Sequence, residues 1–180
     1  EVKIDGGLVN VCAPYEATLT STSAGATGQT WSISPRTGWK YINGTNQNSP
    51  VARVRFEKNG EYTLKIKINT VCGDREADLT QKIIVKSKPE VDMDTLIGSC
   101  RPFTIAPTAT VKNDGDLPLT YEWTIAGGSI TSSSNQAPGN IVFTDLGKFP
   151  VTFKAKNSCG VDSVTRYLEV RDKITVFFPH

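Results

Sequence analysis

One short pattern occurs twice in this chain, and it divides the sequence into two repeats. Residues 69–73 read NTVCG, and residues 156–160 read KNSCG. When the two Cys-Gly pairs are superimposed, with small changes in loop length further upstream, similar residues coincide along both halves: Phe56 with Phe143, Gly60 with Gly147, Tyr62 with Phe149, Trp31 with Trp123, and Cys12 with Cys100. Self-similarity at a fixed period is the signature of a tandem array. The chain is therefore predicted to contain two homologous units of about 90 residues each.

Each unit has the residue pattern of an all-β domain. Residues 61–68 read EYTLKIKI and residues 149–155 read FPVTFKA, so apolar and polar residues alternate in both. Such alternation is typical of a strand with one buried and one exposed face. Short strands separated by regular turns predict two tandem Ig-like β-sandwiches, with Trp31 and Trp123 in their cores.

The boundary between the units is predicted within residues 87–90, which read SKPE. Proline cannot donate a hydrogen bond to a sheet, and it stiffens a linker. The predicted domains are residues 1–88 and 89–180. The tail from about residue 174 follows the last strand in the same way as the linker does, so it is compatible with the start of a third unit.

Four cysteines allow three disulfide connectivities, and the repeat favours one of them. Each unit has one cysteine near its first core strand and one just after its penultimate strand, so we expect one disulfide within each unit, Cys12–Cys72 and Cys100–Cys159. Closing a loop of that size contributes roughly 4 kcal/mol in the chain-entropy description. A metal site or a nucleophilic thiol is the weaker alternative, because the sequence has no CxxC pair and no base partner. Disulfides predict an oxidising, extracytoplasmic compartment.

The segment from Gly60 to Gly73, its counterpart from Gly147 to Gly160, and the W-T-I run at residues 123–125 together resemble the polycystic-kidney-disease (PKD) repeat. The resemblance covers both units almost end to end. The pattern is most similar to the cysteine-bearing PKD-like repeats in large secreted surface proteins of Bacteroidetes, such as gliding-motility adhesins exported by the type IX pathway. It implies a stiff spacer or adhesive module outside the cell, whose partners are neighbouring repeats, surface glycans or other cell-surface proteins.

The composition offers little for enzymatic chemistry. The single histidine is His180, so Ser-His and Cys-His mechanisms have no base. Two pairs of aspartates two residues apart are the remaining acid–base candidates, Asp92 with Asp94 and Asp114 with Asp116. The first pair lies at the domain boundary and the second in a turn, where carboxylates are ordinarily solvated. We therefore expect no enzymatic activity.

Calcium is the cofactor to consider for the turn with the sequence KNDGD. Calcium takes six to eight oxygen ligands, which Asp/Asn/Gly turns often supply. Asn113, Asp114 and Asp116 are the candidate ligands, and a plain turn is the alternative. No other cofactor is expected.

Trp39 and Tyr41 are the candidate ligand-binding residues. They alternate in the sequence TGWKY, so their side chains are predicted to share one face of a strand. Unit 2 has the sequence GGSI in this region, so the fold does not require Trp39. The alternative function is therefore a carbohydrate-binding accessory module of a secreted polysaccharide-active enzyme.

The charge pattern argues against two classes of partner. The chain has 20 basic and 18 acidic residues, a formal charge of +2, and no basic stripe of the kind that binds nucleic acid. No apolar run approaches the roughly 18 residues needed to cross a bilayer, so membrane insertion is not expected.

Overall fold

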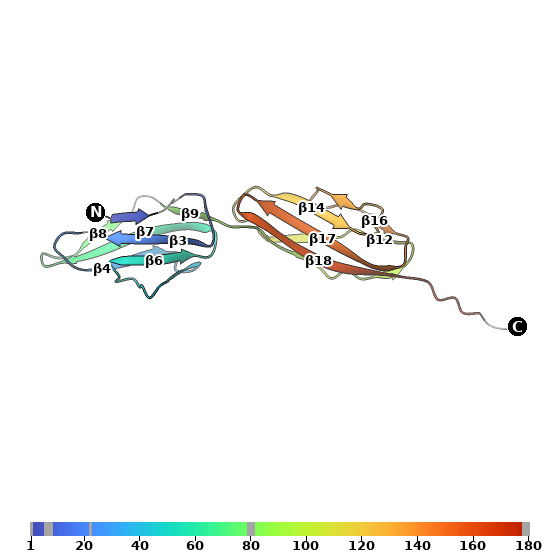
Figure 1. The fold of residues 1–180 in the computed structure, drawn as a ribbon, viewed down its shortest axis with the longest axis horizontal. Helices are drawn as coiled ribbons and strands as arrows, with labels where there is room; N and C mark the ends of the chain where they lie inside the picture. Colours follow the sequence, from blue (N-terminus) through green and yellow to red (C-terminus); the bar gives the residue numbers. More distant parts are fainter. Residues whose placement is uncertain (1, 6–8, 22, 79–81, 178–180) are drawn as a thin grey trace. The chain divides into compact units, whose positions relative to one another are not determined.

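The computed structural model describes residues 2–5, 9–21, 23–78 and 82–177 of the 180-residue chain (Figure 1). The chain divides into two compact units, Glu1–Ser87 and Lys88–His180, so the division falls one residue before the predicted boundary. Within the described ranges all regular elements are β-strands, and the predicted all-β fold is confirmed.

Unit 1 contains two sheets. Its described strands, in chain order, are β1 (Val2–Asp5), β2 (Val11–Cys12), β3 (Tyr15–Ser21), β4 (Ala26–Ser34), β5 (Trp39–Tyr41), β6 (Val51–Phe56), β7 (Gly60–Thr70), β8 (Arg75–Asp78) and β9 (Ile83–Lys86). One sheet has the order β1-β3-β6-β5 and the other has the order β2-β9-β7-β4, with β8 also paired to β7. The pairings are antiparallel except that of β2 with β9, which is parallel.

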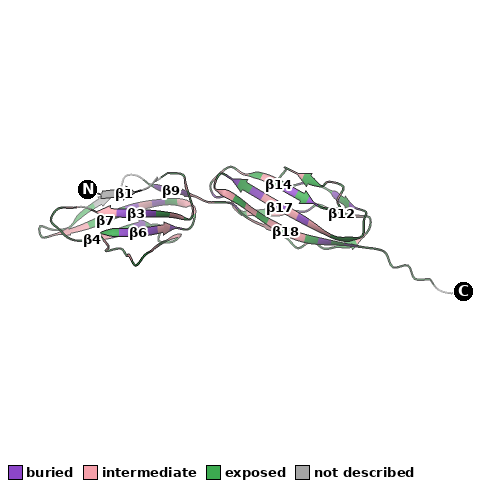
Figure 2. Ribbon diagram, in the orientation of Figure 1, coloured by how far each residue is buried: buried purple, intermediate pink, exposed green. Residues whose placement is uncertain are grey.

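The core of unit 1 follows from the alternation in its strands (Figure 2). Along β7 the buried residues are Tyr62, Leu64 and Ile66, and the residues between them face outward. Trp31 on β4 pairs with Ile66 and is 1% exposed, which confirms its predicted place in the core. Burial of these side chains supplies the main driving force for folding, because apolar surface leaves water.

Unit 2 also has two layers of strands, but one layer consists of two separate two-stranded sheets. Its described strands are β10 (Glu90–Met93), β11 (Ser99–Cys100), β12 (Phe103–Ile105), β13 (Ala109–Asn113), β14 (Thr120–Ile125), β15 (Ser132–Ser133), β16 (Ile141–Phe143), β17 (Gly147–Asn157) and β18 (Gly160–Arg171). The larger sheet has the order β11-β18-β17-β14-β15, and the opposite layer is formed by the pairs β10-β13 and β12-β16. Trp123 on β14 is fully buried, as predicted.

The strand registers confirm the repeat read from the sequence. Gly60 pairs with Val85 in unit 1, and Gly147 pairs with Val170 in unit 2. The same holds for the other equivalent positions, which pair as follows: Trp31 with Ile66 and Trp123 with Phe153, Tyr15 with Phe56 and Phe103 with Phe143, Cys12 with Lys86 and Cys100 with Arg171. Residues that are equivalent in sequence therefore occupy equivalent places in the two sandwiches.

One difference between the units has a simple local cause. Unit 2 has two short strands, β12 and β13, where unit 1 has the continuous strand β3. Pro107 lies in the gap between them, at the position that corresponds to Leu19 on β3. Proline has no N–H group to donate to a ladder, so a strand is interrupted there.

Candidate functional site

The cysteines of unit 1 lie at opposite ends of the sandwich. Cys12 is the last residue of β2 and pairs with Lys86 on β9. Val85, the residue before Lys86, pairs with Gly60, the first residue of β7, so Cys12 lies near the start of β7. Cys72 lies two residues after Thr70, the last residue of β7, and is therefore at the other end of this strand. Because a strand rises about 3.4 Å per residue, the length of β7 separates these two cysteines by roughly 30 Å.

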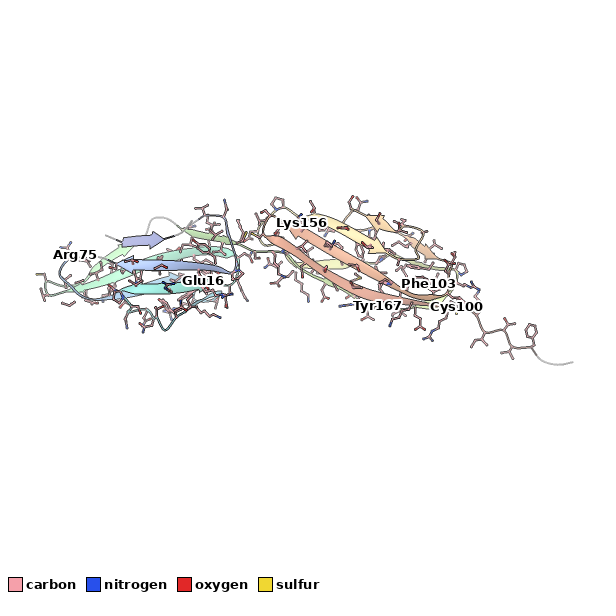
Figure 3. The ribbon with its side chains drawn as sticks, viewed as in Figure 1. Glu16, Arg75, Cys100, Phe103, Lys156 and Tyr167 are labelled. Carbon is pink, nitrogen blue, oxygen red and sulfur yellow. The ribbon has the colours of Figure 1, made fainter. Side chains whose placement is uncertain are left out.

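The cysteines of unit 2 are separated in the same way. Cys100 pairs with Arg171 on β18. Val170, the residue before Arg171, pairs with Gly147, so Cys100 lies near the start of β17. Cys159 lies in the turn between β17 and β18, at the other end. Figure 3 shows this separation within unit 2, because Cys100 and Lys156, which lies three residues before Cys159, are at opposite ends of the long strands.

The predicted disulfides Cys12–Cys72 and Cys100–Cys159 are wrong. A disulfide requires Cα atoms within about 7 Å of each other, which the position of the two cysteines in each unit does not allow. Cys72 and Cys100 are free thiols, whereas Cys12 and Cys159 are each disulfide-bonded. Each predicted pair contains one free cysteine, so neither predicted disulfide forms.

The cysteines are also absent from the cores that the sequence pattern assigned to them. Cys12 and Cys72 are exposed, and Cys100 and Cys159 are half-buried. The buried tryptophans instead pack among apolar side chains, and Trp123 lies with its ring 4.8 Å from that of Phe153. Each core is therefore formed by apolar residues, and of the four cysteines only Cys72 and Cys100 carry free thiols.

The two Cys-Gly turns have the same hydrogen-bonded structure. In unit 1 the backbone N–H of Cys72 donates to the hydroxyl of Thr70 at 3.2 Å. In unit 2 the backbone N–H of Cys159 donates to the side-chain oxygen of Asn157 at 2.9 Å. The glycine after each cysteine has a positive φ, +112° and +147°, which favours glycine at this point of the turn. The free thiol of Cys72 is therefore held in the same kind of turn as the bonded sulfur of Cys159.

Cys100 lies in a shallow depression at the end of unit 2. Its thiol donates to the backbone oxygen of Asp172 at 3.6 Å, and Asp172 pairs with Arg101 at 3.1 Å. The depression has a volume of about 360 Å³ and is lined by Gly98, Ser99, Cys100, Glu169 and Arg171. The β11 strand thus presents its cysteine on a preformed surface.

Trp39 and Tyr41 lie together on β5, as the alternation predicted. Their rings are in edge-to-face contact, with centroids 5.2 Å apart. The indole N–H of Trp39 donates to the backbone oxygen of Pro35 at 2.7 Å, and burial raises the pKa of the Tyr41 hydroxyl above its usual value. Both side chains are half-buried and pack against the core, so they are partly structural.

The two aromatic residues line a depression that the sequence pattern did not reveal. It has a volume of about 340 Å³, and the exposed residues Arg36 and Gln47 also line it. Both come from loops, where no periodicity marks a residue as part of a site. In unit 2 Gly128 pairs with Phe143 as Trp39 does with Phe56, and a Cβ on Gly128 would lie 2.5 Å from Ile141. This depression is consequently a feature of unit 1.

The candidate calcium loop has the geometry of a capped turn. The side-chain oxygen of Asn113 accepts the N–H of Gly115 at 2.9 Å, and that of Asp114 accepts the N–H of Asp116 at 2.8 Å. The backbone oxygen of Asp114 accepts from Asn157 at 2.9 Å. Across the described part of the chain, no group of three or more His, Cys, Asp or Glu side chains is gathered. Calcium binding by Asn113, Asp114 and Asp116 stays a prediction.

The other acidic pair has a structural role. Asp92 pairs with Lys112 at 2.7 Å and with Arg166 at 3.0 Å, and the hydrogen bond from Lys112 is the main reason that its pKa lies below its usual value. These contacts connect β10 to β13 and β18. The neighbouring Asp94 is exposed, and His180 lies outside the described residues.

Comparison with known proteins bears on the fold. No family model and no curated protein matches the sequence. Among solved structures, the insect immune protein hemolin has a TM-score of 0.50 at 14% identity, over 95% of this chain and 47% of hemolin. Both units are Ig-like β-sandwiches.

Other solved structures are similar at lower scores. The fibronectin(III)-like modules of CbhA from Clostridium thermocellum match over 100% of both chains at 17% identity, with a TM-score of 0.37. The titin domains I67–I69 match over 95% of this chain and 66% of theirs at 14% identity, with a TM-score of 0.38. The described residues include no helix that is long and apolar enough to cross a membrane.

Proposed function

We propose that this chain is a non-enzymatic structural module of an extracellular protein, a spacer built from successive Ig-like repeats. The repetition of one sandwich carries this proposal, because equivalent residues of the two units have equivalent strand partners. Cys12 and Cys159 are disulfide-bonded, and a disulfide is stable in an oxidising compartment, which supports a location outside the cytoplasm.

Single-molecule force spectroscopy with handles at both ends tests this proposal. Under reducing conditions we expect two separate unfolding steps, because each unit has a core of its own. Each step should add on the order of 300 Å of contour length, at about 3.4 Å per residue. Extension of the chain without resolved unfolding steps would refute the spacer role.

The finer assignment rests on the sequence resemblance. The pattern from Gly60 to Gly73 favours a PKD-like repeat of a Bacteroidetes cell-surface adhesin, such as one exported by the type IX pathway for gliding motility. In that setting the partners are neighbouring repeats of the same chain, with surface glycans or other surface proteins as ligands. Immunolabelling of intact cells of the source organism should detect the repeats at the surface, and labelling only after lysis would contradict this location.

A second candidate function is carbohydrate binding at the depression beside β5. The observation that favours it is the pairing of Trp39 with Tyr41 next to Arg36 and Gln47, since sugars stack on aromatic rings and hydrogen-bond to polar side chains. A glycan array should then show binding that is lost in Trp39→Ala. The matched control is Tyr167→Ala, which removes an exposed aromatic side chain from unit 2. Equal binding by both variants would exclude this site.

A further inference from the structure

The depression beside β5 lies where both sheets of unit 1 have a free edge. β4 is the last strand of one sheet, and β5 is the last strand of the other. Both strands line the depression, β4 through Ile33 and β5 through Trp39 and Tyr41. Strands at the edge of a sheet have backbone groups that no neighbouring strand uses. A ligand in this depression can therefore contact backbone groups of unit 1 as well as side chains.

The edge of β4 offers one such backbone donor, the N–H of Ile33. The N–H of Trp31 donates to the backbone oxygen of Gln47 at 2.7 Å, so it points away from β7. The N–H groups of an antiparallel strand alternate in direction, so that of Ile33, two residues further on, points to the same side. Among the described strands β4 pairs only with β7, and no described loop residue accepts this N–H. Ile33 thus presents an unused donor to the depression.

The equivalent donor of unit 2 is already used. Ile125 corresponds to Ile33, and its N–H donates to the backbone oxygen of Thr131 at 2.9 Å. The short strand β15 pairs with the same edge of β14. The unused N–H and the aromatic pair are consequently both features of unit 1.

Arg36 brings a positive charge to the same depression. This residue lies in the loop between β4 and β5, it is exposed, and within the described ranges it takes part in no ion pair. Lys40 on β5, by contrast, is paired with Glu57 at 2.6 Å. Arg36 is the one charged residue among the described residues that line the depression. Its guanidinium is therefore available to a ligand with a single negative charge.

We propose that the depression beside β5 binds a uronic acid unit of an acidic polysaccharide. The guanidinium of Arg36 and the N–H of Ile33 hold the carboxylate, because a guanidinium presents its donors in a fork that matches two carboxylate oxygens. The sugar ring lies against Trp39 and Tyr41. This inference deepens the second candidate function, carbohydrate binding, and rests on it.

The size and the charge of the depression both favour a single acidic sugar unit. Its volume of about 340 Å³ is at the lower end of the range for small-molecule sites, which is about 300–1,000 Å³. A neutral sugar would leave the charge of Arg36 unmatched. The side-chain amide of Gln47 also lines the depression, and it can both donate to and accept from the sugar hydroxyls.

The test compares ligands that differ only in charge. Isothermal titration calorimetry measures the affinity of the full chain for trisaccharides of galacturonate, glucuronate and mannuronate, and for the methyl ester of each. We expect at least one acid to bind about tenfold more tightly than its ester, because a charge-assisted hydrogen bond is stronger than a neutral one. The preference should weaken as salt is added, since Arg36 is exposed.

A substitution of Arg36 separates recognition of the carboxylate from stacking of the sugar ring. Arg36→Gln removes the charge and keeps a hydrogen-bonding amide, so the acid should then bind no better than its ester. Arg53→Gln is the matched control, because Arg53 is an exposed arginine of unit 1 that does not line the depression. This control should keep the preference of the wild type.

The amide proton of Ile33 reports the backbone contact directly. Its NMR signal should move downfield when the acid is added, because the N–H gains an acceptor. The amide of Ile125 is the control, since its N–H is already bonded within unit 2, and its signal should stay in place. An unmoved Ile33 signal with the acid bound would overturn the proposed contact.

Equal affinities for acid and ester, or a preference that survives Arg36→Gln, would overturn the inference. Either result with binding that is still lost in Trp39→Ala would leave carbohydrate binding standing. Absence of binding by every trisaccharide would refute carbohydrate binding together with the inference. The spacer role is independent of all these outcomes, because the force measurement tests it without a ligand.

Discussion

Tyr62 in unit 1 occupies the position of Phe149 in unit 2, and the difference between them is one hydroxyl group. The Tyr62 side chain is 2% exposed, and its hydroxyl donates to the backbone oxygen of Lys58 at 2.9 Å. The ring packs against Phe56 with centroids 4.8 Å apart. A buried hydroxyl needs a partner because its hydration is lost on folding. The turn that begins at Lys58 supplies that partner in unit 1.

Tyr62→Phe should therefore destabilise unit 1 by about 1 kcal/mol, because it leaves a backbone oxygen without its donor while the ring packing is kept. Hydrogen exchange of peptides from unit 1 measures the change in the free energy of unfolding. Tyr167→Phe is the matched control, since that side chain is 56% exposed, and it should change the same quantity by less than about 0.5 kcal/mol. Equal effects of the two substitutions would contradict the role of the Tyr62 hydroxyl.

At the scale of elements, the short parallel strands β2 and β11 determine where Cys12 and Cys100 lie. Each has two residues and pairs with the last strand of its own unit. The approach is close in unit 2, because a Cβ on Gly98 would clash with the backbone oxygen of Glu169. No side chain fits between these backbones, so glycine is required just before β11.

Gly98→Ala should consequently displace β11 from β18. We expect lower hydrogen-exchange protection in residues 98–101 and in the paired end of β18, with the core around Trp123 unchanged. Ser99→Ala is the control, because Ser99 is exposed. Unchanged protection in Gly98→Ala would show that β11 does not depend on this close approach.

A second element-scale prediction concerns pH, through Asp92 on β10. Its pKa is lowered in the folded state, chiefly by the hydrogen bond from Lys112. The stabilisation is therefore complete above the pKa of the unfolded carboxyl group, and it is lost as pH falls through the lower pKa of the folded one. Melting temperatures of the wild type and Asp92→Asn should differ at neutral pH and converge in acid. Asp94→Asn, at an exposed position, should follow the wild type at every pH.

The sequence predicted the long strands well and the cysteine pairing badly, for physical reasons. Strands such as β7 and β17 bury one face, so alternation marks them, and the repeat gives their register. The strands β2 and β11 have only two residues each, and the alternation of apolar and polar residues cannot be recognised over so short a length. The repeat showed that Cys12 and Cys100 are equivalent, but equivalence in sequence does not say at which end of a sandwich a residue lies. In the depression beside β5, Trp39 and Tyr41 were predicted from their alternation. Arg36 and Gln47 were not predicted, because they come from loops.

At the scale of the whole molecule, the chain contains two sandwiches of the same design, and each has a core of its own. Cys12 and Cys159 are disulfide-bonded and Cys72 and Cys100 are free, so no cysteine pair closes the core of either unit in the way that the repeat predicted. The stability of each unit therefore comes mainly from the burial of its apolar side chains.

Peptide mapping under non-reducing conditions tests the central claim most directly. Free thiols of the folded chain are first alkylated, the chain is digested with trypsin without reductant, and the cross-linked peptides are identified by mass spectrometry. We predict that Cys72 and Cys100 are both alkylated, whereas Cys12 and Cys159 are protected from alkylation because they are disulfide-bonded. Cross-links of Cys12 to Cys72 and of Cys100 to Cys159 would contradict it.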